Sequence, residues 1–182
     1  MRRRIHGSKD HSDVAASLCS LGQVYRAQGR LDRCASLHEK SLAMRRRIHG
    51  SKGHSDVAAS LHCLAQVSMV LGRLDESASL YEESLAMLRR IYGSKDHSDV
   101  AASLCSLGQV YMVQGRWGKC ASLTEESLAM TLRIHGSKDH SDVAASLHSL
   151  ALVYMVQGRL HECARLHEES LAMSRRMQDA SL

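Results

Sequence analysis

The stretch GSKDHSDVAASL at residues 7–18 decides how this chain folds, because it occurs four times. It returns, with Gly53 replacing an aspartate in the second copy, at residues 50–61, 93–104 and 136–147. Self-similarity at a period of roughly 20 to 50 residues is the signature of repeat architectures. The constant step of 43 residues divides the chain into one array of four units and a tail, namely residues 5–47, 48–90, 91–133, 134–176 and 177–182.

Two helical patterns follow one another inside each unit. In the first unit, residues 13–28 place apolar side chains at the three-to-four spacing of one helix face and stop at Gly29. A second pattern over residues 31–49 stops at Gly50. Because such a hairpin cannot bury its apolar faces alone, neighbouring hairpins must stack. The predicted fold is all-α, a right-handed α-solenoid of four helix-turn-helix repeats.

Composition agrees with a helical protein. The 182 residues contain no proline, no phenylalanine and one tryptophan, and a chain so poor in aromatic residues does not favour sheets. No apolar run approaches the roughly 18 residues of a membrane span, and the N-terminus lacks the apolar core of a signal peptide. We therefore expect a cytoplasmic protein.

Residues 18–42, LCSLGQVYRAQGRLDRCASLHEKSL, resemble the tetratricopeptide repeat, with a small residue at Gly22, an aromatic at Tyr25 and a second small residue at Cys34. The joint GSKDHSDVAASL looks like the G-x-x-H-P-D-V-A stretch of the kinesin-light-chain and nephrocystin type of this repeat. Alanine alternates with glycine at the position of Gly22, which indicates that small size is what the position requires. The resemblance implies a non-catalytic scaffold that holds a peptide or protein partner.

Three positions depart from the family pattern. Serine replaces the proline after the joint histidine in all four copies, and we expect Asp10, His11 or Ser12 to cap the first helix. The Asn pair that the light-chain family carries before L-A is replaced by pairs such as Cys19-Ser20, so the cargo specificity of that family does not transfer. The bulky aromatic of the second helix is also replaced, and looser packing is expected at His38, Tyr81, Thr124 and His167.

The resemblance also indicates where a partner would bind, because the first helix of each hairpin lines the concave surface in this repeat class. Glutamine amides suit an extended peptide backbone, and methionine and valine offer an adaptable apolar strip. By position, the groove consists of Cys19, Gln23, Arg26, Ala27, His62, Gln66, Met69, Val70, Cys105, Gln109, Met112, Val113, His148, Leu152, Met155 and Val156.

Other kinds of site are less favoured by the sequence. Adjacent side chains in the joint point in different directions, so no catalytic relay is expected from its histidine, serine and aspartate. The six cysteines do not recur in step, which argues against a disulfide framework. No metal or other cofactor is expected, although Cys19, His62, Cys105 and His148 form one column.

Arginine clusters and the chain ends leave alternatives open. The clusters near the ends of second helices offset the negative pole of the helix dipole, and the weaker alternative is that they bind nucleic acid or another anion. Residues 1–9 repeat residues 44–52, and no polar capping helix follows the array. We expect exposed apolar end faces, and therefore a longer array or end-to-end self-association. A sensor or scaffold segment of a larger signalling protein is the alternative function.

Overall fold

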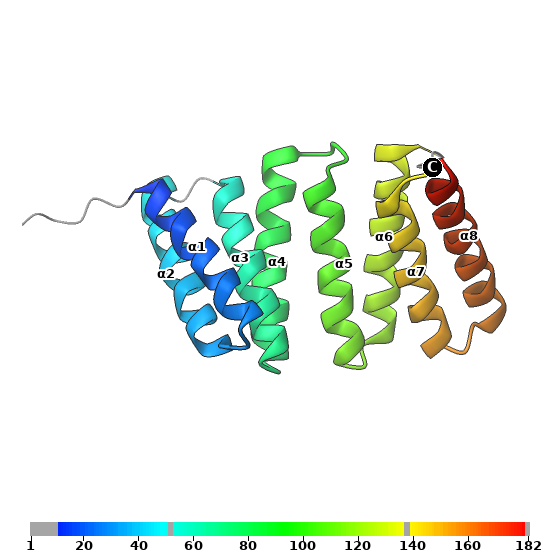
Figure 1. Ribbon diagram of the computed structural model, residues 1–182, viewed down its shortest axis with the longest axis horizontal. Coiled ribbons are helices and arrows are strands. Elements are labelled where there is room, and N and C mark those ends of the chain that lie inside the picture. The colour runs from blue at the N-terminus through cyan, green and yellow to red at the C-terminus, as the bar shows by residue number, and fades with distance from the viewer. Residues whose placement is uncertain (1–10, 51–52, 137–138, 181–182) are drawn as a thin grey trace, which may run out of the picture.

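The computed structural model describes residues 11–50, 53–136 and 139–180, which form eight α-helices in four antiparallel hairpins stacked in a row (Figure 1). No strand occurs in these ranges. The predicted all-α solenoid is confirmed. The helices in chain order are α1 (Ser12–Ala27), α2 (Leu31–His49), α3 (Ser55–Val70), α4 (Leu74–Tyr92), α5 (Ser98–Val113), α6 (Trp117–His135), α7 (Ser141–Val156) and α8 (Leu160–Asp179).

Glycines end the helices where the sequence pattern predicts. Gly29 separates α1 from α2 with φ of +72°, and Gly50 ends α2 with φ of +66°. These angles lie in the left-handed region, which glycine adopts without the steric cost of a Cβ atom. The helix expected over residues 13–28 is shifted by one residue, and the helix expected over residues 31–49 is found with those bounds.

The small residues of the first helices face bulkier residues of the second helices. A Cβ atom on Gly22 would lie 2.9 Å from Nε2 of His38, and one on Gly108 would lie 3.0 Å from Oγ1 of Thr124. The expectation of looser packing here is wrong for His38 and Tyr81, which are 1% and 2% exposed. Thr124 is also buried, but a cavity of about 40 Å³ lies beside its shorter side chain.

One hydrogen bond ties the two helices of every hairpin together. A serine hydroxyl of the second helix donates to an alanine carbonyl of the first helix, 26 residues earlier, over 2.7 to 2.9 Å. Because the helix register is the same in all units, the bond recurs with the 43-residue step. The pairs are Ser41 with Ala15, Ser84 with Ala58, Ser127 with Ala101 and Ser170 with Ala144.

The two outer helices leave apolar side chains exposed. Val14 of α1 is 48% exposed, whereas its counterpart Val57 of α3 is 2% exposed. Leu171 of α8 is 51% exposed, whereas its counterpart Leu128 of α6 is buried. The inner hairpins bury these positions against their neighbours, so the apolar end faces expected from the sequence are confirmed. Residues 5–10 and 181–182, which the unit division includes, lie outside the described residues.

Candidate functional site

The first helices of neighbouring hairpins lie beside one another. Helix α1 contacts α3 and α5 contacts α7, with Cα atoms within 8 Å, while second helices of the described chain show no comparable approach. Closer spacing of first helices puts them on the inner side of the array. The groove residues predicted from the sequence all belong to these first helices.

The apolar strip of the predicted groove is exposed at one edge and packed at the other. Val70, Val113 and Val156 end their helices and are 62%, 56% and 47% exposed. Met69 and Met112 are half-buried and pack against the core, so they contribute less free surface than expected. The strip that a partner would meet therefore consists chiefly of the three valines and Met155, which is 49% exposed.

The glutamine column is not uniform. Gln23 and Gln109 are exposed, whereas Gln66 is half-buried and bound to its neighbours. Arg26 donates to Gln66 Oε1 over 3.2 Å, and Gln66 Nε2 lies 3.3 Å from His62 Nε2. This chain of polar contacts links α1 to α3 across the groove, so a peptide backbone would have to exchange hydrogen bonds with Gln66 rather than find its amide free.

The cysteines and histidines of the predicted column contact hydroxyl groups and aromatic rings of the protein itself. Cys19 Sγ lies 3.0 Å from Ser41 Oγ, and the His62 ring meets the Tyr81 ring edge-on at 5.0 Å. Burial raises the pKa of the Cys105 thiol and lowers the pKa of the His62 imidazole, which favours the neutral form of both. Among the described residues, the clusters whose geometry suits a metal ion lie elsewhere.

Two hollows open between successive first helices. One of about 250 Å³ lies between α3 and α5, and one of about 300 Å³ lies between α5 and α7. Each is floored by small Ala and Ser side chains and carries a carboxylate on its wall, Asp99 in the first and Asp142 in the second. Matching positions line the two hollows, so they are copies of one feature at the 43-residue step.

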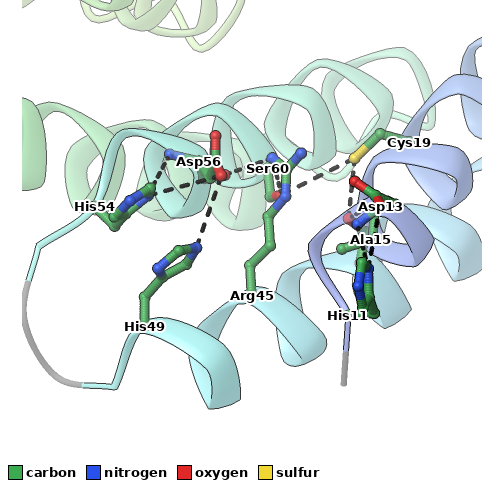
Figure 2. Close-up of polar contacts among 10 residues, drawn as sticks. His11, Asp13, Ala15, Cys19, Arg45, His49, His54, Asp56 and Ser60 are labelled. Carbon is green, nitrogen blue, oxygen red and sulfur yellow. Dashed lines mark hydrogen bonds and ion pairs between the residues drawn. The ribbon is translucent and has the colours of Figure 1, made fainter. Parts of the chain in front are cut away.

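The equivalent space one repeat step earlier is filled by a side chain of the first unit. Arg45 of α2 donates over 2.6 Å to the carbonyl oxygen of Asp56 and over 3.0 Å to Ser60 Oγ (Figure 2). The corresponding residues of the next two units are Leu88 and Thr131, which line the hollows but do not reach across them. The hollows exist because these side chains are shorter than Arg45.

Other arginines near the ends of second helices form ion pairs within the array. They connect successive second helices, or a second helix with the joint that precedes its hairpin. Such partners account for these charges without an external anion. Pairs at 2.6 to 2.8 Å are Arg46–Glu83, Arg89–Glu126, Arg133–Asp96 and Arg176–Asp139. Residues 2–4, another predicted cluster, lie outside the described residues.

The joint acts as a structural connection between units. In each of the four joints a histidine, not the serine that follows it, caps the first helix, as when His54 Nδ1 accepts from the Asp56 amide over 3.1 Å. Of the three expected caps, His11 has this role in α1, Ser12 is the first helical residue, and Asp10 lies outside the described residues. The capping histidine also stacks on the last residue of the preceding helix, as His54 does on His49 at 3.5 Å.

Sequence reasoning missed the hollows, the filling of the first one by Arg45 and the stacked rings. The signal for the hollows is present, since residues 45, 88 and 131 differ in length at one repeat position. Whether a side chain at this position reaches the next hairpin depends on how the second helix is oriented relative to that hairpin. The repeat pattern does not specify this orientation.

Comparison with known families and structures covers nearly the whole chain. A profile described as tetratricopeptide repeat matches residues 56–130 and 99–176, and a second profile with this description matches residues 14–56. A search of curated proteins gives no significant match. No described helix is both long and apolar enough to cross a membrane.

Solved structures similar to the chain are helical repeat proteins. BtubC (BKLC) from P. vanneervenii is 22% identical with a TM-score of 0.84, over 95% of this chain and 68% of that one. A putative kinesin light chain from Podosopora anserina, with nearly identical TPR-like repeats, is 25% identical with a TM-score of 0.77, over 95% and 81% of the two chains. A variant of that protein is 26% identical with a TM-score of 0.80, over 97% and 81%.

Proposed function

The chain belongs to the tetratricopeptide repeat family, and from this premise we propose that its groove of first helices binds an extended peptide segment of a protein partner. Repeats of this family generally mediate protein–protein interaction and are typically non-catalytic. The six cysteines are free thiols in the structure, which fits the reducing cytoplasm that forms part of the proposal.

The two hollows between first helices are the observation that carries this proposal. Their volumes of about 250 and 300 Å³ suit single side chains rather than a whole small molecule. The exposed valines lie at the C-terminal ends of α3, α5 and α7, whereas the residues of these helices that line the hollows belong to their N-terminal halves. A peptide that placed side chains in the hollows would bury apolar surface of their alanine walls, and this burial would add affinity.

Arg45 indicates which side chain the hollows would accept. It binds the Asp56 carbonyl and the Ser60 hydroxyl of the second unit, and the third unit offers the same groups at Asp99 and Ser103, both of which line the open hollow. The carboxylate of Asp99 adds a negative charge. A guanidinium group has five donors and suits such an arrangement of acceptors. The proposed segment therefore carries arginine.

The spacing of the two hollows sets the register of that segment. Packed helices lie about 8 to 10 Å apart, and an extended chain advances about 3.3 Å per residue. Side chains two or three residues apart in the peptide would thus reach successive hollows. The preferred pattern is two arginines separated by one or two residues.

Filling the hollows from within tests the proposal. Twelve-residue peptides are selected from a displayed random library on the full chain, and their affinities are then measured for the Leu88→Arg and Thr131→Arg variants. Arginine at these positions copies the first unit, so the fold should tolerate it, and circular dichroism checks helicity. We expect each variant to weaken binding at least tenfold.

Arg46→Leu serves as the matched control. It alters an arginine of a second helix beside Arg45, and it copies Leu132, the residue found at this position in the third unit. Peptides that bind both hollow-filling variants as tightly as the unchanged chain would contradict the proposal, as would a selection that yields no arginine-containing peptide.

A further inference from the structure

Two joints between repeat units bring together side chains that commonly bind metal ions. The last residue of a second helix, the capping histidine and the aspartate two residues later form each cluster, and Figure 2 shows the first of them. Their ligand atoms all lie within 4.8 Å of one another. The clusters are His49, His54 and Asp56 between α2 and α3, and His135, His140 and Asp142 between α6 and α7.

The joint between them shows which hydrogen bond His49 lacks. There Tyr92 replaces the first histidine, stacks on His97 at 3.5 Å and donates from its hydroxyl to Asp99 Oδ2 over 3.3 Å. His49 stacks in the same way on its capping histidine, but its Nε2 is buried and has no hydrogen-bond partner among the described residues. A buried nitrogen without a partner is costly, so this geometry calls for a further ligand.

The separations between ligand atoms suit a shared ion better than a direct bond. Asp56 Oδ2 lies 3.7 Å from His49 Nε2 and 3.8 Å from His54 Nδ1, both too long for a hydrogen bond. Ligands at about 2.0 to 2.1 Å from a tetrahedral zinc ion lie about 3.3 to 3.4 Å apart. Imidazole lone pairs lie in the ring plane, so the two rings, which stack at an interplanar angle of 10°, would have to tilt apart to bring these atoms onto one ion.

The second cluster repeats this geometry. Asp142 Oδ2 lies 3.5 Å from His135 Nε2 and 3.7 Å from His140 Nδ1. The His135 and His140 rings stack at 3.6 Å, as the rings of the first cluster do. Two joints separated by two repeat steps thus present the same donors at nearly the same distances.

We propose that each of these two joints binds one Zn²⁺ ion, although no metal is expected from the sequence alone. Two imidazoles and a carboxylate are ligands that zinc accepts, and water would supply the fourth. The ion would compete with the Asp56 amide for the His54 Nδ1 lone pair, so it exchanges a cap hydrogen bond for a metal bond. Its ligands come from both sides of the joint, and it would therefore link α2 to α3, and α6 to α7.

The tyrosine joint supplies the substitutions for the test. Zn²⁺ uptake by the full chain is measured by equilibrium dialysis, and circular dichroism confirms that each variant is folded. His49→Tyr and His135→Tyr copy a joint that the protein already uses. We expect each to bind one ion fewer per chain and the double variant to bind two fewer.

Tyr92→His is the converse variant, because it completes a third cluster with His97 and Asp99 and should add one ion per chain. His6 precedes His11 at the corresponding position and lies outside the described residues, so uptake is compared between variants and not read as an absolute number. Equal uptake by the unchanged chain and the double variant would overturn the proposal. No added ion in a folded Tyr92→His variant would also count against it.

Discussion

Gly22 lies against the imidazole of His38, so closely that a Cβ atom on the glycine would be 2.9 Å from Nε2. His38 is 1% exposed and cannot move aside without repacking the hairpin. Alanine gains about 1 kcal/mol of helix propensity over glycine, whereas overpacking a core costs about 1 to 3 kcal/mol. At this position the cost of overpacking should exceed the gain in helix propensity.

Gly22→Ala is therefore expected to lower the free energy of unfolding by about 1 kcal/mol in urea denaturation. Gly118→Ala in α6 is the matched control, since no atom lies within 4 Å of the Cβ that it would add. That variant should be neutral or slightly stabilising. Equal effects of the two substitutions would show that propensity, and not the contact with His38, governs the glycine position.

The stability of the first hairpin should depend on the charge of His38. Burial, followed by the charges of Arg26 and Arg45, lowers the pKa of His38 below its ordinary value of 6.5. The unfolded chain therefore binds the proton more readily, and the folded state loses stability as the pH falls below about 6.5. His38→Thr copies the Gly108–Thr124 pair of the third unit.

Thermal unfolding of the unchanged chain and of His38→Thr between pH 5 and pH 8 checks this dependence. The melting temperature of the unchanged chain should fall more steeply on the acid side. His62, whose pKa is also lowered by burial, leaves a residual slope in the variant. Parallel profiles for both proteins would exclude His38 as the titrating group.

The serine hydrogen bond that recurs in each hairpin should be worth more where it is more deeply buried. Ser84 is 0% exposed and bonds the Ala58 carbonyl over 2.9 Å, and the half-buried Ser170 bonds the Ala144 carbonyl over the same distance. A buried hydrogen bond contributes about 1 kcal/mol. Ser84→Ala should lower the free energy of unfolding by about this amount, and Ser170→Ala by clearly less. A larger loss for Ser170→Ala would contradict the role of burial.

Gly53 interrupts an ion pair that the later units contain. Arg133 binds Asp96 through two hydrogen bonds of 2.8 Å, but one unit earlier Gly53 replaces the aspartate, so Arg90, the counterpart of Arg133, lacks this carboxylate. A two-pronged contact of this kind is the geometry in which a surface pair contributes. Gly53→Asp should raise the melting temperature slightly at low salt, and Gly53→Ala controls for the added Cβ atom, which would lie 3.3 Å from Cγ of Met87 in both variants. A rise that persists in 1 M salt would contradict the ionic explanation.

The glutamines of the groove should affect binding and not folding. Replacing Gln66 and Gln109 with alanine removes two amides from the inner wall, one of which links Arg26 to His62. Peptides selected on the full chain should bind this variant more weakly, while its circular dichroism stays unchanged. Gln157→Ala, at the end of α7, is the control. Unchanged affinity of the double variant would remove the glutamines from the site.

Part of the candidate site could be predicted because each repeat position meets the same environment. The exposed edge formed by Val70, Val113 and Val156 follows from such positions. Gln66 shows the limit, since its amide is occupied by Arg26, a residue of the preceding unit that later units replace with methionine. Contacts made by residues that differ between the repeat units cannot be predicted from the consensus sequence of the repeat.

By itself, the sequence determined the period, the bounds of α2 and the glycine turns, since these depend on local backbone preferences and on apolar spacing along one helix. Only the tertiary structure decided that Arg45 closes a hollow which Leu88 leaves open, and that His49 meets His54 across a joint. The physical reason is that these contacts join different helices. Their distances depend on how hairpins pack against one another, so a change of one side chain alters them without altering the repeat.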